Sequence, residues 1–132
     1  MTSEHVSASL QRRVRERARD RCEYCGIAQE FQEATFHIDH VVPRVAGGET
    51  SIDNLALACV SCSLRKGPRR VAVDLETAAE VALFNPRTQL WSEHLNLADD
   101  GRLVGLTPTG RATLTLLKMN RPLAVFLRRG AR

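Results

Sequence analysis

The sequence is poor in aromatic residues and has no long apolar segment. Its 132 residues include one tryptophan, one tyrosine and four phenylalanines. No apolar run approaches the roughly 18 residues that cross a bilayer, and residues 1–16 are polar and arginine-rich, without the apolar core of a secretion signal. These absences argue against a membrane-spanning or Sec-secreted protein, so we expect a cytoplasmic protein with no membrane partner.

A strong excess of either charge is also missing. Nineteen Lys and Arg residues stand against fifteen Asp and Glu residues, a formal net charge of +4. This excess is compatible with a polyanionic partner but is too small to identify one. The length is typical of one domain and there is no internal repeat, so we predict a single domain over residues 1–132.

The four cysteines fall in two pairs, each with two residues between its members: Cys22 with Cys25, and Cys59 with Cys62. In a chain without a secretion signal such pairs favour metal binding, although two disulfides or four separate buried thiols are the alternatives. Zinc prefers four tetrahedral thiolate ligands, and the clamp would add folding energy to a domain with few aromatics. We predict a structural zinc site, which leaves no open position for catalysis at that ion.

Local patterns along the chain predict an α+β fold. Expected helices cover residues 9–19, with Ser9 as N-cap, and then 61–66, 111–119 and 123–129. Residues 34–42 are rich in β-branched and aromatic residues, so a strand is expected there. A turn at Asp99-Asp100-Gly101 predicts a hairpin between residues 89–97 and 102–106.

The stretch between the cysteine pairs carries a composite motif over about residues 21–67. Its parts are the first cysteine pair, Asp39-His40 with two apolar residues and Pro43, Gly47-Gly48, Asn54-Leu55, and the second pair with Lys66-Gly67. This arrangement resembles the HNH endonuclease family, in its subtype with two zinc-binding cysteine pairs. The resemblance implies a ββα-metal core, here residues 9–70, and cleavage of phosphodiester bonds with one divalent cation. Residues 71–132 would form an accessory segment with a β-hairpin and helices, packed on that core.

The resemblance also implies roles for three residues. Phosphodiester hydrolysis needs a base that deprotonates water near neutral pH and a cation that stabilises charge on the phosphate. By resemblance, His40 is the general base and Asp39 a ligand of the catalytic cation, for which magnesium or manganese suits the carboxylate oxygen. Asn54 would bond the backbone of the Asp-His loop and orient the base.

One position departs from the family pattern. Ser63 follows the last cysteine, where the family usually has a His or Asn as a further metal ligand, and a hydroxyl is the weaker ligand. His37 lies two residues before Asp39 and therefore on the same strand face, where its imidazole could join the metal ligands or bind phosphate. A half-buried histidine without such a role is the alternative.

Basic residues near the motif are candidates for phosphate contacts, which give affinity without sequence preference. They are Arg44, Arg65, Lys66, Arg69 and Arg70. The expected first helix adds an arginine-rich face that is either solvated or in contact with phosphate. The sequence thus predicts a metal-dependent endonuclease acting on nucleic acid, DNA before RNA. The alternatives are a non-catalytic zinc-containing nucleic-acid binding module and a nuclease of structured RNA.

Overall fold

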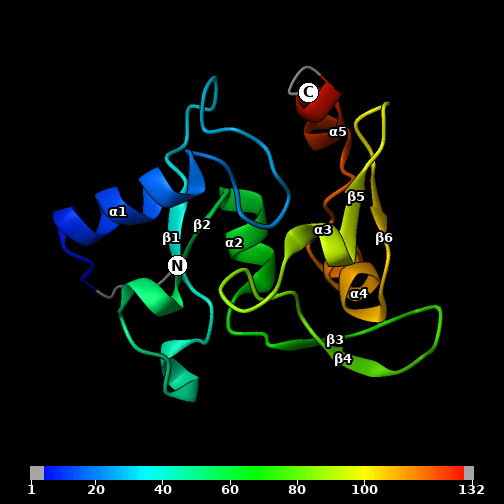
Figure 1. Ribbon diagram of the computed structural model, residues 1–132, viewed down its shortest axis with the longest axis horizontal. Coiled ribbons are helices and arrows are strands. Elements are labelled where there is room, and N and C mark those ends of the chain that lie inside the picture. Colours follow the sequence, from blue (N-terminus) through cyan, green and yellow to red (C-terminus); the bar gives the residue numbers. More distant parts are fainter. Residues whose placement is uncertain (1–4, 130–132) are drawn as a thin grey trace.

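Short helices alternate with short strands in the computed structural model, which describes residues 5–129 (Figure 1). Helices are α1 (Ala8–Ala18), α2 (Val60–Lys66), α3 (Trp91–His94), α4 (Pro108–Leu116) and α5 (Pro122–Arg129), with 3-10 turns at Arg44–Ala46 and Ile52–Asn54. Strands are β1 (His37–His40), β2 (Leu55–Ala58), β3 (Val71–Val73), β4 (Glu80–Ala82), β5 (Leu95–Leu97) and β6 (Leu103–Gly105). Each strand pairs with its neighbour in sequence, so three two-stranded antiparallel sheets result. The predicted α+β class is confirmed.

Helix α1 begins earlier than the sequence pattern predicts. The hydroxyl of Ser7, and not that of Ser9, accepts a hydrogen bond from the Leu10 backbone N–H at 3.1 Å. Ser9 therefore lies within the first turn of the helix. The helix buries Val14 completely, and the guanidinium of Arg17 donates to the backbone carbonyls of Ile52 and Leu55.

A ββα unit follows and carries the motif. Strand β1 pairs with β2 from His37 opposite Ala58 to His40 opposite Leu55. All four residues of β2 are buried, as their apolar sequence requires. Helix α2 starts directly after β2, with Cys59 as N-cap, and packs against both strands. This places the end of β1 beside α2.

Residues 71–129 form the accessory layers in the right half of Figure 1. The predicted Asp-Gly hairpin is present as β5 and β6, but Trp91–His94 is a helical turn and not part of the first strand. Helix α4 begins one residue after Thr107, whose hydroxyl accepts from the Gly110 N–H at 3.0 Å. Asn120, which lies two residues before α5, brackets the backbone of Leu103 with its side chain.

One hydrophobic cluster contains side chains from both segments, among them Val14 and Leu57 of the first and Leu117 and Met119 of the second. Arg128 of α5 is also buried and donates to the carbonyls of Gly101, Cys25 and Met119. The ends of the predicted domain, 1–4 and 130–132, lie outside the described residues. Within residues 5–129, no helix is long and apolar enough to cross a membrane.

Candidate active site and metal centre

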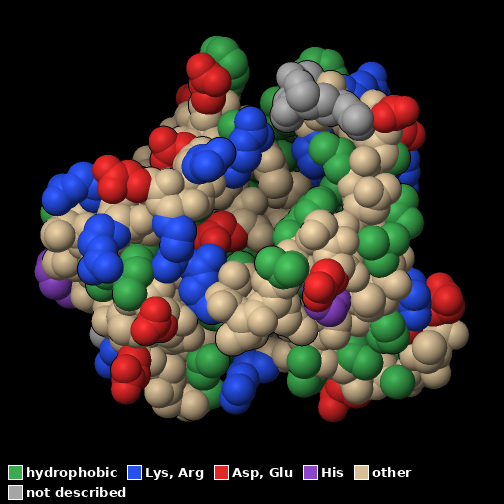
Figure 2. Space-filling model, in the orientation of Figure 1, with side chains coloured by type: hydrophobic (Ala, Val, Ile, Leu, Met, Phe, Trp, Pro, Cys, Tyr) green, Lys and Arg blue, Asp and Glu red, His purple; other side chains and the backbone are tan. Residues whose placement is uncertain are grey.

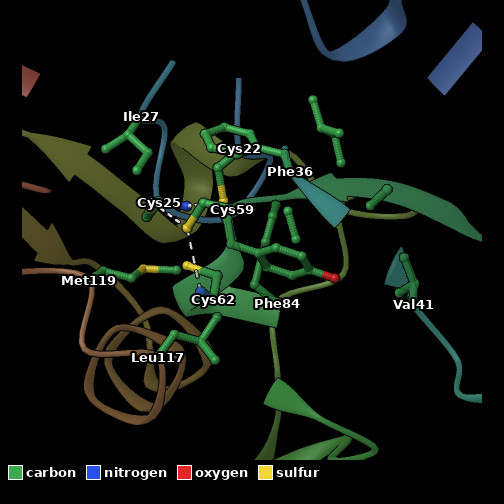
Figure 3. Close-up of a cluster of buried hydrophobic side chains, with 14 of the residues drawn as sticks. Cys22, Cys25, Ile27, Phe36, Val41, Cys59, Cys62, Phe84, Leu117 and Met119 are labelled. Atoms are coloured by element: carbon green, nitrogen blue, oxygen red, sulfur yellow. Dashed lines mark hydrogen bonds between the residues drawn. The ribbon is translucent and has the colours of Figure 1, made fainter. Parts of the chain in front are cut away.

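The four cysteines meet in the interior (Figure 3). Their sulfur atoms lie within 4.8 Å of one another, and the distance of 3.7 Å between Cys25 Sγ and Cys59 Sγ is far longer than a disulfide bond. Within each pair, a backbone N–H of the second cysteine donates to the sulfur of the first at 3.4 Å. The donor set and its compactness fit a structural zinc ion, as predicted.

Charge and burial around this cluster suit a bound cation. Burial raises the pKa of the Cys22 thiol, and a bound cation would favour its ionised form. Four thiolates around one zinc ion leave two net negative charges. The guanidinium of Arg121 lies 3.5 Å from Cys59 Sγ, and that of Arg128 contacts the Cys25 carbonyl at 3.0 Å. These two side chains place positive charge beside the cluster.

Asp39 is buried near the end of β1 with two partners on one of its oxygens. The Tyr24 hydroxyl donates to Oδ2 at 3.1 Å, and Lys66 Nζ lies 3.2 Å from the same atom. Burial raises the pKa of Asp39, and the Lys66 ammonium and the Tyr24 hydroxyl act in the opposite direction. The carboxylate is thus held in the interior by a paired charge and a hydrogen bond.

His40 follows Asp39 and is fixed by a residue that the sequence motif does not single out. Its Nε2 lies 2.8 Å from the hydroxyl of Thr50, to which Arg44 also donates at 2.9 Å. Lys66 donates to the His40 backbone carbonyl at 3.2 Å. Ring and backbone of His40 are therefore held from different sides, by the loop after β1 and by α2.

The loop between His40 and Thr50 is closed by Asn54. Its side-chain oxygen accepts from the Val42 N–H at 2.9 Å, and its amide donates to the carbonyls of Val42 at 3.0 Å and Glu49 at 2.9 Å. Gly48 packs so tightly here that a Cβ would lie 1.7 Å from the Val42 carbonyl oxygen. Only glycine fits at this position without moving the loop.

A cleft of about 330 Å³ opens at this place. Its walls come from the end of β1, the following loop and α2, and its lining residues are Asp39, His40, Pro43, Arg44, Val45, Ser63, Leu64, Gly67 and Pro68. The carboxylate, the imidazole and one exposed arginine of the motif thus reach the same concave surface.

His37 and Ser63 are joined to each other, with His37 Nδ1 2.8 Å from Ser63 Oγ. Ser63 lines the cleft, whereas His37 is not one of its lining residues. In the described part of the chain, the four cysteines are the one group of three or more His, Cys, Asp or Glu side chains whose ligand atoms converge closely. Asp39 and Ser63 line the same cleft, and magnesium in proteins is commonly held by one or two carboxylates while it keeps water or substrate oxygens as further ligands.

The predicted basic contacts separate into two groups. Arg44, Arg65, Arg69 and Arg70 are exposed. Lys66 is only 3% exposed and its ammonium lies on Asp39, so this side chain is directed into the protein, and its contact with phosphate stays a prediction. Helical spacing explains the difference, because Lys66 lies one turn after Cys62 and Ser63, on the face of α2 that packs against β1.

The arginine-rich face of α1 is likewise divided. Figure 2 shows basic side chains gathered over this helix. Arg15 donates to the Phe36 carbonyl and Arg17 to carbonyls of Ile52 and Leu55, so both bind the protein's own backbone. Arg12, Arg13 and Arg19 remain exposed.

Residues 22–69 match the family model of the HNH endonucleases, from the first cysteine of the cluster to just past Gly67. No curated protein matches the chain. The match confirms the resemblance inferred from the motif and includes every predicted site residue except Arg70.

Proposed function

Because residues 22–69 form an HNH endonuclease segment, we propose that the protein is a metal-dependent endonuclease that hydrolyses phosphodiester bonds of DNA. The observation that supports this most directly is the cleft, which His40, Asp39, Ser63 and Arg44 line together. A base, a carboxylate ligand and a cationic side chain are the groups that phosphodiester hydrolysis requires.

In this proposal His40 accepts the proton of the attacking water. An imidazole titrates near neutral pH and so exchanges protons readily under physiological conditions. The contact between Nε2 and the Thr50 hydroxyl fixes the ring, and Asn54 fixes the backbone that follows it. These contacts hold the base in one orientation, which reduces the ordering needed to reach the transition state.

Asp39 and Ser63 would hold the catalytic cation, magnesium or manganese. His37 would orient the Ser63 hydroxyl through their hydrogen bond, or would itself be a ligand of the cation. The cation would supply charge stabilisation to the phosphate and the leaving oxygen. The zinc held by the cysteine pairs has a structural role, because its four positions are filled by thiolates.

Exposed arginines on two sides of the cleft would bind the DNA backbone. Arg44 lies in its wall, and Arg65, Arg69 and Arg70 lie at and beyond the end of α2. Replacing Arg69 and Arg70 by Gln should weaken DNA binding and lower the slope of log affinity against log salt by about 1 per lost contact. We also propose a cytoplasmic location, where reducing conditions keep the four thiols available to zinc.

The test is cleavage of supercoiled plasmid DNA by the zinc-loaded protein with magnesium or manganese. Wild type should cut, whereas His40→Ala and Asp39→Asn should lose at least about a hundredfold in rate, as expected for a missing base. His5→Ala, which changes an exposed histidine before α1, is the matched control and should cut like wild type. An uncut plasmid with wild type, or normal cutting by His40→Ala, would contradict the proposal.

One observation favours the second candidate function, a non-catalytic nucleic-acid binding module. The Lys66 ammonium already neutralises the Asp39 carboxylate, so a cation must share that group with a buried charge. If the protein binds DNA with the expected salt dependence but cuts neither DNA nor structured RNA, this second function replaces the first. Cutting of structured RNA alone would make the protein a ribonuclease.

A further inference from the structure

Tyr24 connects the zinc cluster to the catalytic carboxylate. It lies between the two cysteines of the first pair, its side chain is only 1% exposed, and its hydroxyl donates to Asp39 Oδ2 at 3.1 Å. A buried phenol needs a hydrogen-bond partner, and here the partner is the predicted cation ligand. One residue therefore spans the interior between the structural metal site and the cleft.

The position of Tyr24 is fixed from several directions. Trp91 Nε1 donates to the Tyr24 carbonyl at 2.8 Å, and Phe84 packs edge-on against the ring at a centroid distance of 6.5 Å. The preceding residue, Glu23, exchanges two hydrogen bonds of 2.8 Å with Leu57 of β2, the strand paired with β1. The hydroxyl cannot move away from Asp39 unless the cysteine-containing turn moves as well.

Both partners of Asp39 contact the same oxygen. Tyr24 and Lys66 both lie on Oδ2, and among residues 5–129 no hydrogen-bond donor is found at Oδ1. Two donors that converge on one oxygen restrict rotation of the carboxylate. Since Asp39 lines the cleft, this arrangement keeps Oδ1 for a ligand that enters from the cleft.

We infer that Tyr24 is a positioning residue, which orients Asp39 so that Oδ1 is presented to the divalent cation. The inference rests on the proposed nuclease function. It differs from a purely structural role in one measurable way. If Tyr24 only fills the core, loss of its hydroxyl lowers stability and leaves cation affinity unchanged. If it positions Asp39, the same change also weakens cation binding.

The experiment titrates manganese into the zinc-loaded, full-length protein and follows the free ion by electron paramagnetic resonance. Tyr24→Phe keeps the ring and removes only the hydroxyl. A hydrogen bond to a charged group is worth roughly a factor of ten or more, so manganese affinity should fall about tenfold. Asp39→Asn should abolish the site. Asn120→Ala loses the bracket on Leu103, which contacts neither Tyr24 nor Asp39, and should bind manganese like wild type.

The possible outcomes separate the two proposals. If wild type binds manganese, Asp39→Asn does not, and Tyr24→Phe binds as tightly as wild type, the role of Tyr24 is wrong and the cation site stands. Equal weakening by Asn120→Ala and Tyr24→Phe would point to a general loss of stability and would also overturn the specific role of the hydroxyl. If wild type does not bind manganese, or Asp39→Asn binds equally well, the cation site of the proposed function is wrong.

A second measurement keeps the inference testable if Tyr24→Phe does not fold. Tyr24 is the only tyrosine in the chain, so biosynthetic 3-fluorotyrosine labels this position alone. Bound manganese should broaden the fluorine resonance strongly in the wild-type sequence and leave it sharp in Asp39→Asn. A resonance that stays sharp in wild type at saturating manganese would place the ion away from Tyr24 and overturn the inference.

Discussion

Asn54 brackets the backbone of Val42, accepting from its N–H at 2.9 Å and donating to its carbonyl at 3.0 Å. The same amide donates to the Glu49 carbonyl at 2.9 Å. One side chain thus ties together the chain just after His40 and the chain just before Thr50, which holds the imidazole. The geometry of the proposed base therefore depends on this bracket as well as on the contact with Thr50.

Replacing Asn54 by Ala should reduce cleavage far more than stability alone explains. The change removes three hydrogen bonds and should cost about 1–3 kcal/mol of unfolding free energy. The loop that carries Thr50 would then lose its attachment, so the cleavage rate should fall by at least about tenfold, the effect of a small misplacement of a catalytic group. Urea unfolding and plasmid cleavage measure the two effects.

The chain offers a matched control in Asn120, which brackets Leu103 in the same way, with hydrogen bonds of 2.7 and 2.9 Å. This bracket lies in the accessory segment and does not line the cleft. Asn120→Ala should lose a similar amount of stability and keep the cleavage rate at temperatures where it is folded. Equal losses of activity in both variants would show that Asn54 acts only through stability.

Replacing Lys66 by Met should destabilise the protein even in the absence of DNA. The variant leaves the Asp39 carboxylate buried without its cation, and breaking such a pair typically costs about 3–5 kcal/mol. The double variant Lys66→Met with Asp39→Asn should recover part of this loss. Denaturant unfolding of the zinc-loaded proteins measures the free energy of unfolding of each variant.

Arg65→Met changes the neighbouring exposed residue and should stay within about 0.5 kcal/mol of wild type. If Lys66→Met is as stable as wild type but binds DNA more weakly, the prediction fails and Lys66 contacts phosphate.

Removal of zinc should unfold the protein, because folding places four thiols in one buried site. A strong chelator at neutral pH should release one zinc ion per chain and abolish the folded circular dichroism signal. Removal of magnesium or manganese alone should stop cleavage and leave the fold intact. A chain that stays folded after its zinc has been removed would contradict the structural role of the cluster.

The ion pair between Asp74 and Arg111 should make stability depend on pH in the acid range. The Arg111 guanidinium, at 2.9–3.0 Å, lowers the pKa of Asp74 from 3.8 to about 2. Because the pKa in the folded state is the lower one, the pair stabilises the protein fully above about pH 4 and loses this effect as the pH falls toward 2.

Asp74→Asn should therefore be less stable than wild type at pH 5, with a difference that shrinks between pH 4 and pH 2. Their urea midpoints are compared at each pH at which both proteins still hold zinc and remain folded, because loss of zinc would unfold them. A difference that is constant over this range would exclude ionisation of Asp74 as its source.

Much of the fold and the motif follows from local sequence signals. Paired cysteines, the Asp100-Gly101 turn and the Thr107 cap each act within a few residues, and the structure contains the cysteine cluster, the hairpin and the capped helix. Trp91–His94 departs from the predicted strand because its indole bonds the Tyr24 carbonyl, 67 residues away in sequence. Such tertiary contacts override local preference.

The same reason explains what the motif did not reveal at the site. Tyr24 and Thr50 contact Asp39 and His40 through the fold and have no spacing that marks them as functional. Lys66 stands in a run of basic residues, and only the packing of α2 against β1 separates it from the exposed arginines beside it. Burial of one charge within a basic run depends on the helix orientation, which the composition of the run does not encode.

Arg128 connects parts of the chain that are distant in sequence. Its guanidinium bonds the Cys25 carbonyl across 103 residues of sequence and also the turn carbonyl of Gly101. The segment that matches the nuclease family therefore depends on a side chain 59 residues beyond its last matched residue, Arg69, for part of the wall around its metal cluster. Residues 22–69 are for this reason not a self-contained unit. On their own they would lack the Arg128 guanidinium, which bonds the backbone of the first cysteine pair.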